Sequence, residues 1–254
     1  TILADLASNV GGERVSVRSI APRGAEIEEY SPKPEDAKTV SEARVIFTNG
    51  LALDAWSKDL LRNRKSDANV VVVTDGIPAI EDNPHMWFDV QLARRYVEKI
   101  RDALIAADAN GADAYMKNAS AYDAELVKLD GDLKNKAAEI PAPRRKLVTS
   151  HDAFPYFAKA YGFEIVGFVQ PEPDKDPSPA ELAALVETVK KAGVPVIFVE
   201  SQASPRLSEA LAKEAGVTKI VGDIPTDSLE AKPPADTYAG LLRTVMDRIV
   251  SALR

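Results

Sequence analysis

The chain contains only two histidines, and each stands where a helix is predicted to begin. His85 follows Asn83-Pro84 in a turn, and His151 follows a β-branched run at residues 146–149. Imidazole nitrogen binds transition metals and transfers protons, so both residues are candidates for metal binding or acid–base chemistry. A lone histidine at a helix start more often has a capping or surface role. Two of them, one in each half of the chain, favour a ligand site shared by two lobes.

Two loops concentrate carboxylates that could complete such a site. Residues 24–30 carry three glutamates directly after a predicted strand, and residues 223–229 carry two aspartates after the last predicted strand. In open α/β sheets, ligands bind beyond the carboxyl ends of the strands. Each loop can equally be an acidic turn or a helix cap. Composition alone therefore leaves the choice among these carboxylates open.

Composition limits the class of protein. The chain has 254 residues, 45% of them hydrophobic, and lacks an apolar run of the roughly 20 residues that a membrane-spanning helix needs. Its net charge of −7 and scattered basic residues argue against a nucleic-acid partner. The absence of cysteine excludes thiolate metal sites and suits an exported protein. Residues 1–6 already have an amphipathic helical pattern, so we expect a signal peptide to have been removed upstream of them.

The elements that must position these loops alternate between strands and helices, which predicts an α/β fold with mainly parallel sheets. Between residues 113 and 140, apolar residues recur at helical spacing, which predicts one long helix ending before Pro141. We therefore expect an N-terminal lobe at residues 1–112, a connecting helix at 113–142 and a C-terminal lobe at 143–254. The strands are expected at residues 15–20, 44–48, 70–74, 146–149, 164–168, 194–199 and 219–221.

Several short motifs, in this order, resemble the metal-binding proteins of zinc and manganese ABC transporters, the ZnuA/TroA-like family. The resemblance covers nearly the whole chain. It rests on Ile2 to Leu6 with Asn9 to Gly12, the loop from Gly24 to Pro32, Asn49-Gly50 with Trp56, Asn83 to Trp87, Ser150 to Phe154, and Thr226 to Leu229 with Tyr238. The family resemblance implies two α/β lobes joined by a long backbone helix. It also implies one divalent ion held by two ligands from each lobe.

The resemblance transfers four metal ligands to this sequence: Glu28, His85, His151 and Asp227. Glu28 stands where family members ordinarily have histidine. Two imidazoles with two carboxylates make a harder site, which suits manganese or iron, whereas His151 is typical of the zinc-binding members. The sequence therefore predicts Zn²⁺ or Mn²⁺ as the transported ion, with Fe²⁺ as a third candidate. Asp152 and Glu200 are candidates for fixing the orientation of an imidazole.

The resemblance implies a periplasmic or otherwise extracytoplasmic, monomeric solute-binding protein that delivers its ion to an ABC permease and is not an enzyme. Metal affinity is expected to fall as the pH drops through roughly 6 to 7, where histidine takes up a proton. A metal-dependent hydrolase is the alternative, but the sequence lacks an HExxH or similar motif. An adhesin or other binding module on the same scaffold is a further alternative.

Overall fold

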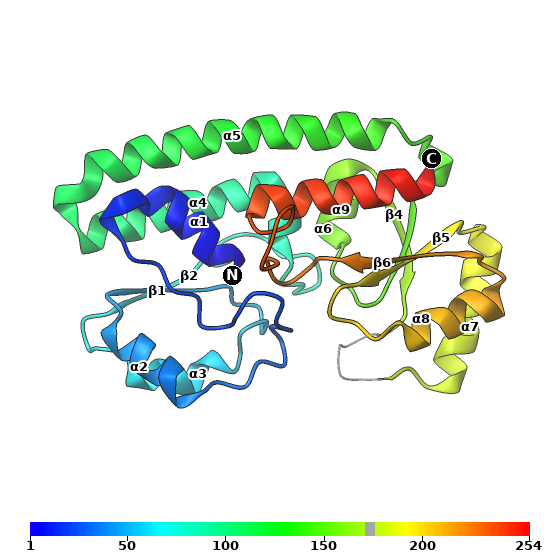
Figure 1. Cartoon of the computed structure of the whole chain (residues 1–254), viewed down its shortest axis with the longest axis horizontal. Helices are drawn as coiled ribbons and strands as arrows, with labels where there is room; N and C mark the ends of the chain where they lie inside the picture. The colour runs from blue at the N-terminus through cyan, green and yellow to red at the C-terminus, as the bar shows by residue number, and fades with distance from the viewer. Residues whose placement is uncertain (171–175) are drawn as a thin grey trace. The chain divides into compact units, whose positions relative to one another are not determined.

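The computed structural model describes residues 1–170 and 176–254 and has an α/β architecture of helices and short parallel strand pairs (Figure 1). Its contacts divide the chain into two compact units. Unit 1 comprises Thr1–Asp130 and Asp227–Ala231, and unit 2 comprises Gly131–Thr226 and Lys232–Arg254. The predicted lobe limits, residues 1–112 and 143–254, stay a prediction. Unlike those consecutive segments, unit 1 includes a short piece of the C-terminal half of the chain.

One long helix, α5, spans Ala112–Ala138 and confirms the helix predicted over residues 113–140. Its buried side chains recur three or four residues apart, which places them on one face of the helix. These side chains are Tyr115, Ala119, Tyr122, Leu126, Leu129, Leu133 and Ala137. Ile140 is also buried, and Pro141 follows where a helix cannot continue.

In unit 1, strand β1 (Val45–Thr48) pairs in parallel with β2 (Asn69–Val72), with Val45 opposite Asn69. Helix α4 packs against both strands and against α1. The helices of this unit, besides part of α5, are α1 (Ile2–Gly11), α2 (Pro34–Glu42), α3 (Ser57–Leu60) and α4 (Val90–Ala107). The carboxyl end of β1 leads into Asn49, and the chain after β2 leads to His85. These are the positions where an α/β sheet places its ligand-binding loops.

The predicted strand at residues 15–20 is wrong, because these residues form no strand ladder. Their alternation is nevertheless visible: Val15 and Val17 are half-buried, whereas Ser16 and Arg18 are exposed. In the described chain, no main-chain hydrogen bond joins residues 15–19 to β1. The alternating pattern correctly predicts which side chains face inward. Pairing also requires a neighbouring strand edge in register, which the pattern of one segment does not specify.

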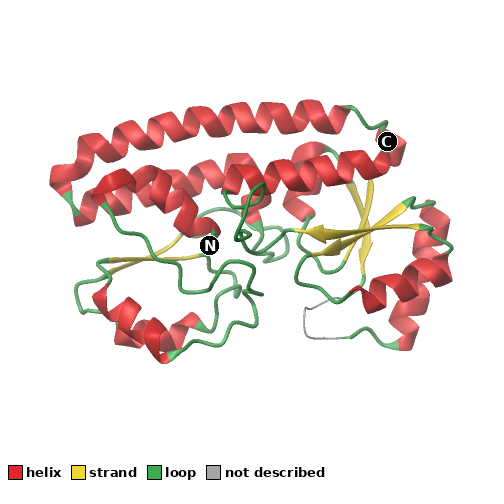
Figure 2. Cartoon of the chain, viewed as in Figure 1, coloured by secondary structure: helices red, strands yellow, loops and turns green. Residues whose placement is uncertain are grey.

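In unit 2, β3 pairs in parallel with β4, β5 pairs in parallel with β6, and β3 lies beside β5 (Figure 2). The strands are β3 (Lys146–Thr149), β4 (Glu164–Phe168), β5 (Val196–Glu200) and β6 (Lys219–Ile224). The helices are α6 (Pro155–Tyr161), α7 (Pro179–Ala192), α8 (Pro205–Ala215) and α9 (Tyr238–Leu253). The other predicted strands overlap the six that the structure describes. The fold class, α/β with parallel pairing and a long helix, is therefore confirmed.

The core of unit 2 is built mainly from valine and other aliphatic side chains. Val148 and Ile197, from the adjacent strands β3 and β5, pack with Val186 and Val189 of α7 and Leu211 of α8. Such β-branched residues suit strands that are buried on both faces. This packing holds the carboxyl ends of β3 and β5 next to each other. His151 follows the first of these ends, and Glu200 forms the second.

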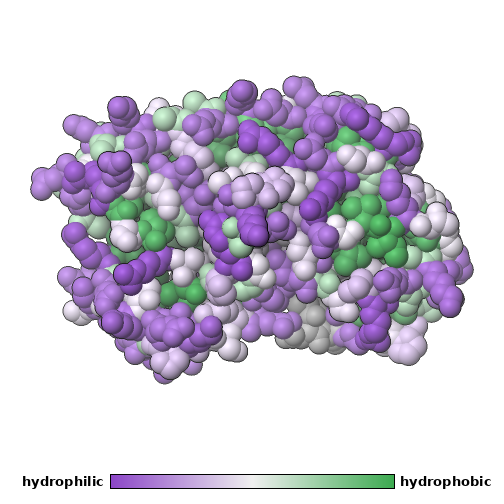
Figure 3. Space-filling model, viewed as in Figure 1, coloured by the Kyte–Doolittle hydropathy of each residue, from purple (hydrophilic) through white to green (hydrophobic). Residues whose placement is uncertain are grey.

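Polar and charged residues cover most of the face seen in Figure 3, and hydrophobic residues there form separate groups. Among the described residues, the large hydrophobic side chains that are exposed are Met116, Val127 and Ile220. No helix in the described part of the chain combines the length and hydropathy needed to cross a lipid bilayer.

Candidate metal centre

His85 is held at the end of a tight turn in unit 1. Glu81 and Asp82 both adopt positive φ angles, of 48° and 58°, and the Asn83 amide donates to the Ile80 carbonyl at 2.8 Å. His85 then precedes a short 3₁₀ turn, Met86–Phe88, whose three side chains are all buried. These hydrophobic anchors fix the backbone next to the histidine. Only 2% of His85 is exposed.

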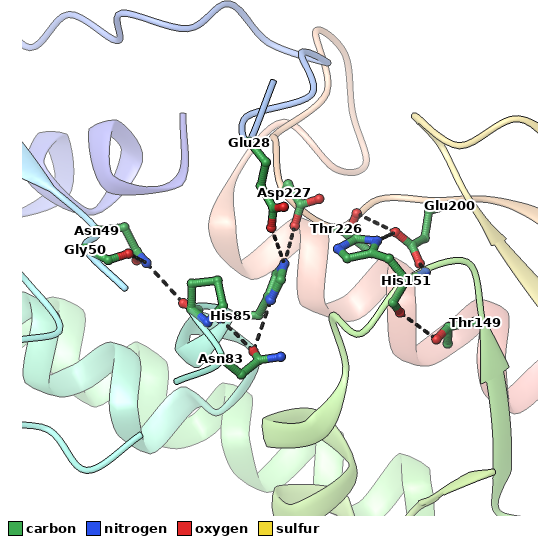
Figure 4. A network of polar contacts seen from close by, with 11 residues as sticks. Glu28, Asn49, Gly50, Asn83, His85, Thr149, His151, Glu200, Thr226 and Asp227 are labelled. Atoms are coloured by element: carbon green, nitrogen blue, oxygen red, sulfur yellow. Dashed lines mark hydrogen bonds and ion pairs between the residues drawn. The ribbon is translucent and has the colours of Figure 1, made fainter. Parts of the chain in front are cut away.

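The side chain of Asn83 fixes the tautomer of His85 (Figure 4). The backbone N–H of His85 donates to Asn83 Oδ1 at 3.0 Å, and the ring Nδ1 lies 3.0 Å from the same atom. Because a backbone N–H can only donate, the shared atom must be the amide oxygen, which accepts. The ring Nδ1 therefore carries a proton toward Asn83. In the neutral ring this leaves the lone pair on Nε2.

Two carboxylates face that lone pair. His85 Nε2 lies 3.2 Å from Asp227 Oδ1 and 3.9 Å from Glu28 Oε1. The Asp227 side chain is 1% exposed and the Glu28 side chain 27%. With Nδ1 protonated and the ring neutral, all three facing atoms are electron-pair donors. Such an arrangement is unfavourable unless a cation stands among them, and imidazole nitrogen with carboxylate oxygen is a suitable ligand set for a divalent transition metal.

The loops that carry Glu28 and Asp227 are tied together inside unit 1. The Gly24 amide donates to the Leu229 carbonyl at 3.0 Å and to Ser228 Oγ at 2.9 Å. On the other side of Glu28, the Trp56 indole N–H donates to the Ile27 carbonyl at 2.8 Å. These hydrogen bonds thus hold the two loops in place near Glu28 and near Asp227. The proximity of Glu28 and Asp227 follows from this packing, although they are far apart in the sequence.

A turn after β1 makes a hydrogen bond to the loop that carries His85, called the histidine loop below. The side-chain Nδ2 of Asn49 donates to the backbone carbonyl of Pro84 at 3.1 Å, one residue before His85. Asp54 holds this turn by accepting from the backbone N–H groups of Asn49 and Gly50 at 2.6 and 3.1 Å. Burial raises the pKa of Asp54, while the two backbone donors act in the opposite direction. Asn49 therefore connects β1 to the histidine loop.

Gly50 has a φ of 89°, and a Cβ at this position would lie 2.5 Å from Val72 Cγ1. Only glycine fits both the backbone conformation and the space. This explains the Asn49-Gly50 pair in the sequence. The asparagine reaches the histidine loop because the glycine permits the sharp turn that follows it.

Replacing Asn49 with alanine is expected to leave the Pro84 carbonyl without its side-chain donor. We expect the free energy of unfolding of the metal-free protein to fall by about 1–3 kcal/mol. Zinc affinity should fall by up to about tenfold, which is the low end of the loss seen when a residue that positions a metal ligand is replaced. Urea unfolding and zinc titration calorimetry measure the two quantities.

The matched control for this variant is Asn63→Ala, which removes an exposed asparagine whose amide makes a local bond to the Leu60 carbonyl at 3.0 Å. It should leave both quantities unchanged. Equal behaviour of the Asn49 and Asn63 variants would contradict the supporting role of Asn49.

The second histidine has a parallel arrangement in unit 2. The backbone N–H of His151 donates to Glu200 Oε1 at 3.0 Å, and its ring Nδ1 pairs with Glu200 Oε2. Thr149 Oγ1 donates to the His151 carbonyl at 2.8 Å. His151 is 7% exposed and Glu200 is 3% exposed. As with His85, one side-chain group receives both the backbone and the ring N–H, so in the neutral ring the lone pair stands on Nε2.

The structure thus brings Glu28, His85 and Asp227 together in unit 1 and places His151 against Glu200 in unit 2. Sequence reasoning did not find the roles of Asn83 and Asn49. The sequence does hint at the role of Asn83, because an asparagine side chain in a turn can accept from the backbone N–H two residues further on, here that of His85. The Asn49 role had no such signal, since its partner is 35 residues away along the chain.

Comparison with known proteins decides the family. Residues 1–252 match the family model described as zinc-uptake complex component A, periplasmic. The chain belongs to this family. Its membership confirms the predicted resemblance and the predicted function, a metal-binding component of an ABC importer that is a carrier and not an enzyme. It gives no support to the hydrolase alternative.

Proteins similar to this chain carry names with different metals. The manganese-binding lipoprotein MntA of Halalkalibacterium halodurans is 36% identical, over all of this chain and 86% of its own length. The iron ABC transporter substrate-binding lipoprotein MtsA of Streptococcus pyogenes is 33% identical, over all of this chain and 86% of its length. The solved periplasmic zinc-binding protein TroA of Treponema pallidum superposes with a TM-score of 0.91 at 29% identity, over 99% of this chain and 96% of that one.

Proposed function

We propose that this protein captures one divalent transition-metal ion outside the cytoplasm with Glu28, His85, His151 and Asp227 and passes it to an ABC permease. The transported ion is Zn²⁺ or Mn²⁺, with Fe²⁺ as a third candidate. Relatives of this chain are named for manganese, iron and zinc, and several are named lipoproteins or periplasmic proteins. We propose that the protein acts as a monomer.

The observation that carries the proposal is the convergence on His85 Nε2. Its lone pair faces Asp227 Oδ1 at 3.2 Å and Glu28 Oε1 at 3.9 Å, within one compact unit. Three donors so arranged match the ligand types of a transition-metal site, with Asn83 behind His85 as its orienting partner. His151, held by Glu200 in the same manner, supplies the fourth donor in this proposal.

The donor set also explains how release can occur. Two neutral imidazoles and two carboxylates bind a divalent ion through reversible coordination bonds, and each of these ligands can also take up a proton. Any change that removes one donor from the set weakens the hold on the ion. Transport therefore requires the protein to bind, protect and release the ion, and no bond in a substrate has to be made or broken.

Isothermal titration of chelator-stripped protein with Zn²⁺, Mn²⁺ and, without oxygen, Fe²⁺ tests this function. We expect one ion per chain, and X-ray absorption of the loaded protein should show a first shell of two nitrogens and two carboxylate groups. Sedimentation with and without metal should give a single monomeric species. A chain that binds none of these ions, or binds them without a defined stoichiometry, would refute the proposed function.

A further inference from the structure

We propose that Glu200 is a positioning residue that sets the tautomer and the ring orientation of His151, and thereby its strength as a metal ligand. The inference rests on the proposed metal-binding role of His151. Glu200 is the last residue of β5, and Figure 4 shows its carboxylate directed at His151, which follows the neighbouring strand β3. Its position on a rigid strand gives the carboxylate a fixed direction.

Each oxygen of this carboxylate has a defined task. Oε1 accepts from the His151 backbone N–H at 3.0 Å, and Oε2 accepts from the ring Nδ1. A carboxylate that accepts from both groups holds the backbone and the ring of one residue together, so the ring cannot rotate without losing a contact. The proton stays on Nδ1, and the lone pair stays on Nε2.

Further contacts hold Glu200 itself in place. Thr226 Oγ1 donates to Glu200 Oε2 at 3.4 Å, and the Glu200 backbone N–H donates to Ser150 Oγ at 3.2 Å. Thr226 directly precedes Asp227 in the chain, so Glu200 is connected to the residues before two of the proposed ligands. A single buried side chain therefore contacts both His151 and Thr226 within unit 2.

The charge of Glu200 distinguishes it from Asn83, its counterpart at His85. Among the described residues, no lysine or arginine forms an ion pair with Glu200, and the ring that its carboxylate contacts is that of His151. A buried carboxylate is favoured by positive charge beside it. A cation on Nε2 makes the imidazole more positive, so Glu200 should strengthen the bond from His151 to the ion. The neutral amide of Asn83 fixes the tautomer of His85 but adds much less to its donor strength.

The experiment reads the tautomer in the metal-free protein by ¹⁵N NMR of histidine-labelled chains at a pH where both rings are neutral. The chain has two histidines, so His85→Gln assigns both signals. The parent should show Nδ1–H for both rings. In Glu200→Ala, His151 should shift toward the Nε2–H tautomer, which an unrestrained imidazole prefers, while His85 stays unchanged. Zinc affinity should fall about 10- to 100-fold.

Two further variants separate positioning from general damage. Glu200→Gln keeps the size of the side chain but has one oxygen for two N–H groups, so its zinc affinity should lie between those of the parent and Glu200→Ala. Glu209→Ala, on the exposed surface of α8, controls for the loss of a carboxylate and should match the parent. If Glu200→Ala fails to fold, the Glu200→Gln and Thr226→Val variants give the same readouts.

An unchanged His151 tautomer in Glu200→Ala, or a zinc affinity within threefold of the parent for both Glu200 variants, would overturn the inference. The proposed function fails separately, because it fails when the parent itself binds no metal. The tautomer of the metal-free protein is measurable in either case, so the two failures are distinguishable.

Discussion

Replacing His85 with glutamine is expected to lower the affinity for Zn²⁺ and Mn²⁺ by ~100- to 1000-fold. Four-ligand zinc sites in small proteins bind with about 10–16 kcal/mol, or about 3–4 kcal/mol for each ligand, which corresponds to this range. The removed atom, Nε2, is the one that Asp227 and Glu28 both face, at 3.2 and 3.9 Å. Without it the two carboxylates lose the nitrogen donor between them, and a neutral amide oxygen is a weak replacement.

Competition with a chelator of known affinity measures the change. The metal-dependent rise in melting temperature gives a second reading, because bound ligand stabilises the folded state in proportion to the logarithm of its concentration over Kd. The His85 ring also packs beside Trp87, with ring centroids 5.1 Å apart, so the melting temperature of the metal-free variant must be recorded separately. A His85→Gln protein that binds both ions within threefold of the parent would remove His85 from the site.

The second large effect is expected at Glu28, where alanine should weaken the binding of every divalent ion. Its side chain is 27% exposed and lies 3.9 Å from His85 Nε2 through Oε1. Loss of one carboxylate ligand should lower the affinity about 100-fold, by the same reasoning of about 3 kcal/mol per ligand. Glutamate is long enough to reach about as far as the distal nitrogen of a histidine.

Glu28→His should raise the preference for Zn²⁺ over Mn²⁺ by about tenfold or more. Three imidazoles with one carboxylate make a softer ligand set, and the general affinity order places Zn²⁺ above Mn²⁺ for nitrogen donors. Direct competition of the two ions for one sample measures the ratio. The neighbouring Glu29 is exposed and provides matched controls, Glu29→Ala and Glu29→His, which should behave as the parent. Parent-like binding by Glu28→Ala would reduce the protein ligands to three.

The sequence pattern was sufficient for elements whose signal is local. The apolar spacing between Tyr115 and Leu133 predicts a helix because the same face is buried along its whole length. The run at Lys146–Thr149 predicts β3 to the residue, since it is short, β-branched and followed by a turn. Residues 15–20 also resemble a strand in sequence, with alternating half-buried and exposed side chains, but no strand pairs with them. A periodicity reports which side is buried, and it does not report which edge is available for pairing.

The candidate site shows the same limit. His85 and His151 stand out by type and position, but the choice of Glu28 and Asp227 among 39 acidic residues came from the family resemblance and not from spacing. The structure adds the reason that these two acids belong together, since Gly24 bonds to both Ser228 and Leu229. Glu200 was a candidate for fixing the orientation of an imidazole, together with Asp152. Its contact with His151 depends on β3 lying beside β5, and such neighbours cannot be read from either strand alone.

Each histidine has its backbone N–H and its ring Nδ1 held by one side chain, and this arrangement bears on which cations the site can bind. Calcium takes roughly six to eight oxygen ligands, and magnesium keeps much of its water and also prefers oxygen. An imidazole free to turn could withdraw its nitrogen and leave the carboxylates to such an ion. Asn83 and Glu200 prevent this by fixing the rings of His85 and His151 through backbone and ring together. The nitrogen lone pairs thus stay in place as donors, and the proposed ligand set cannot become all oxygen.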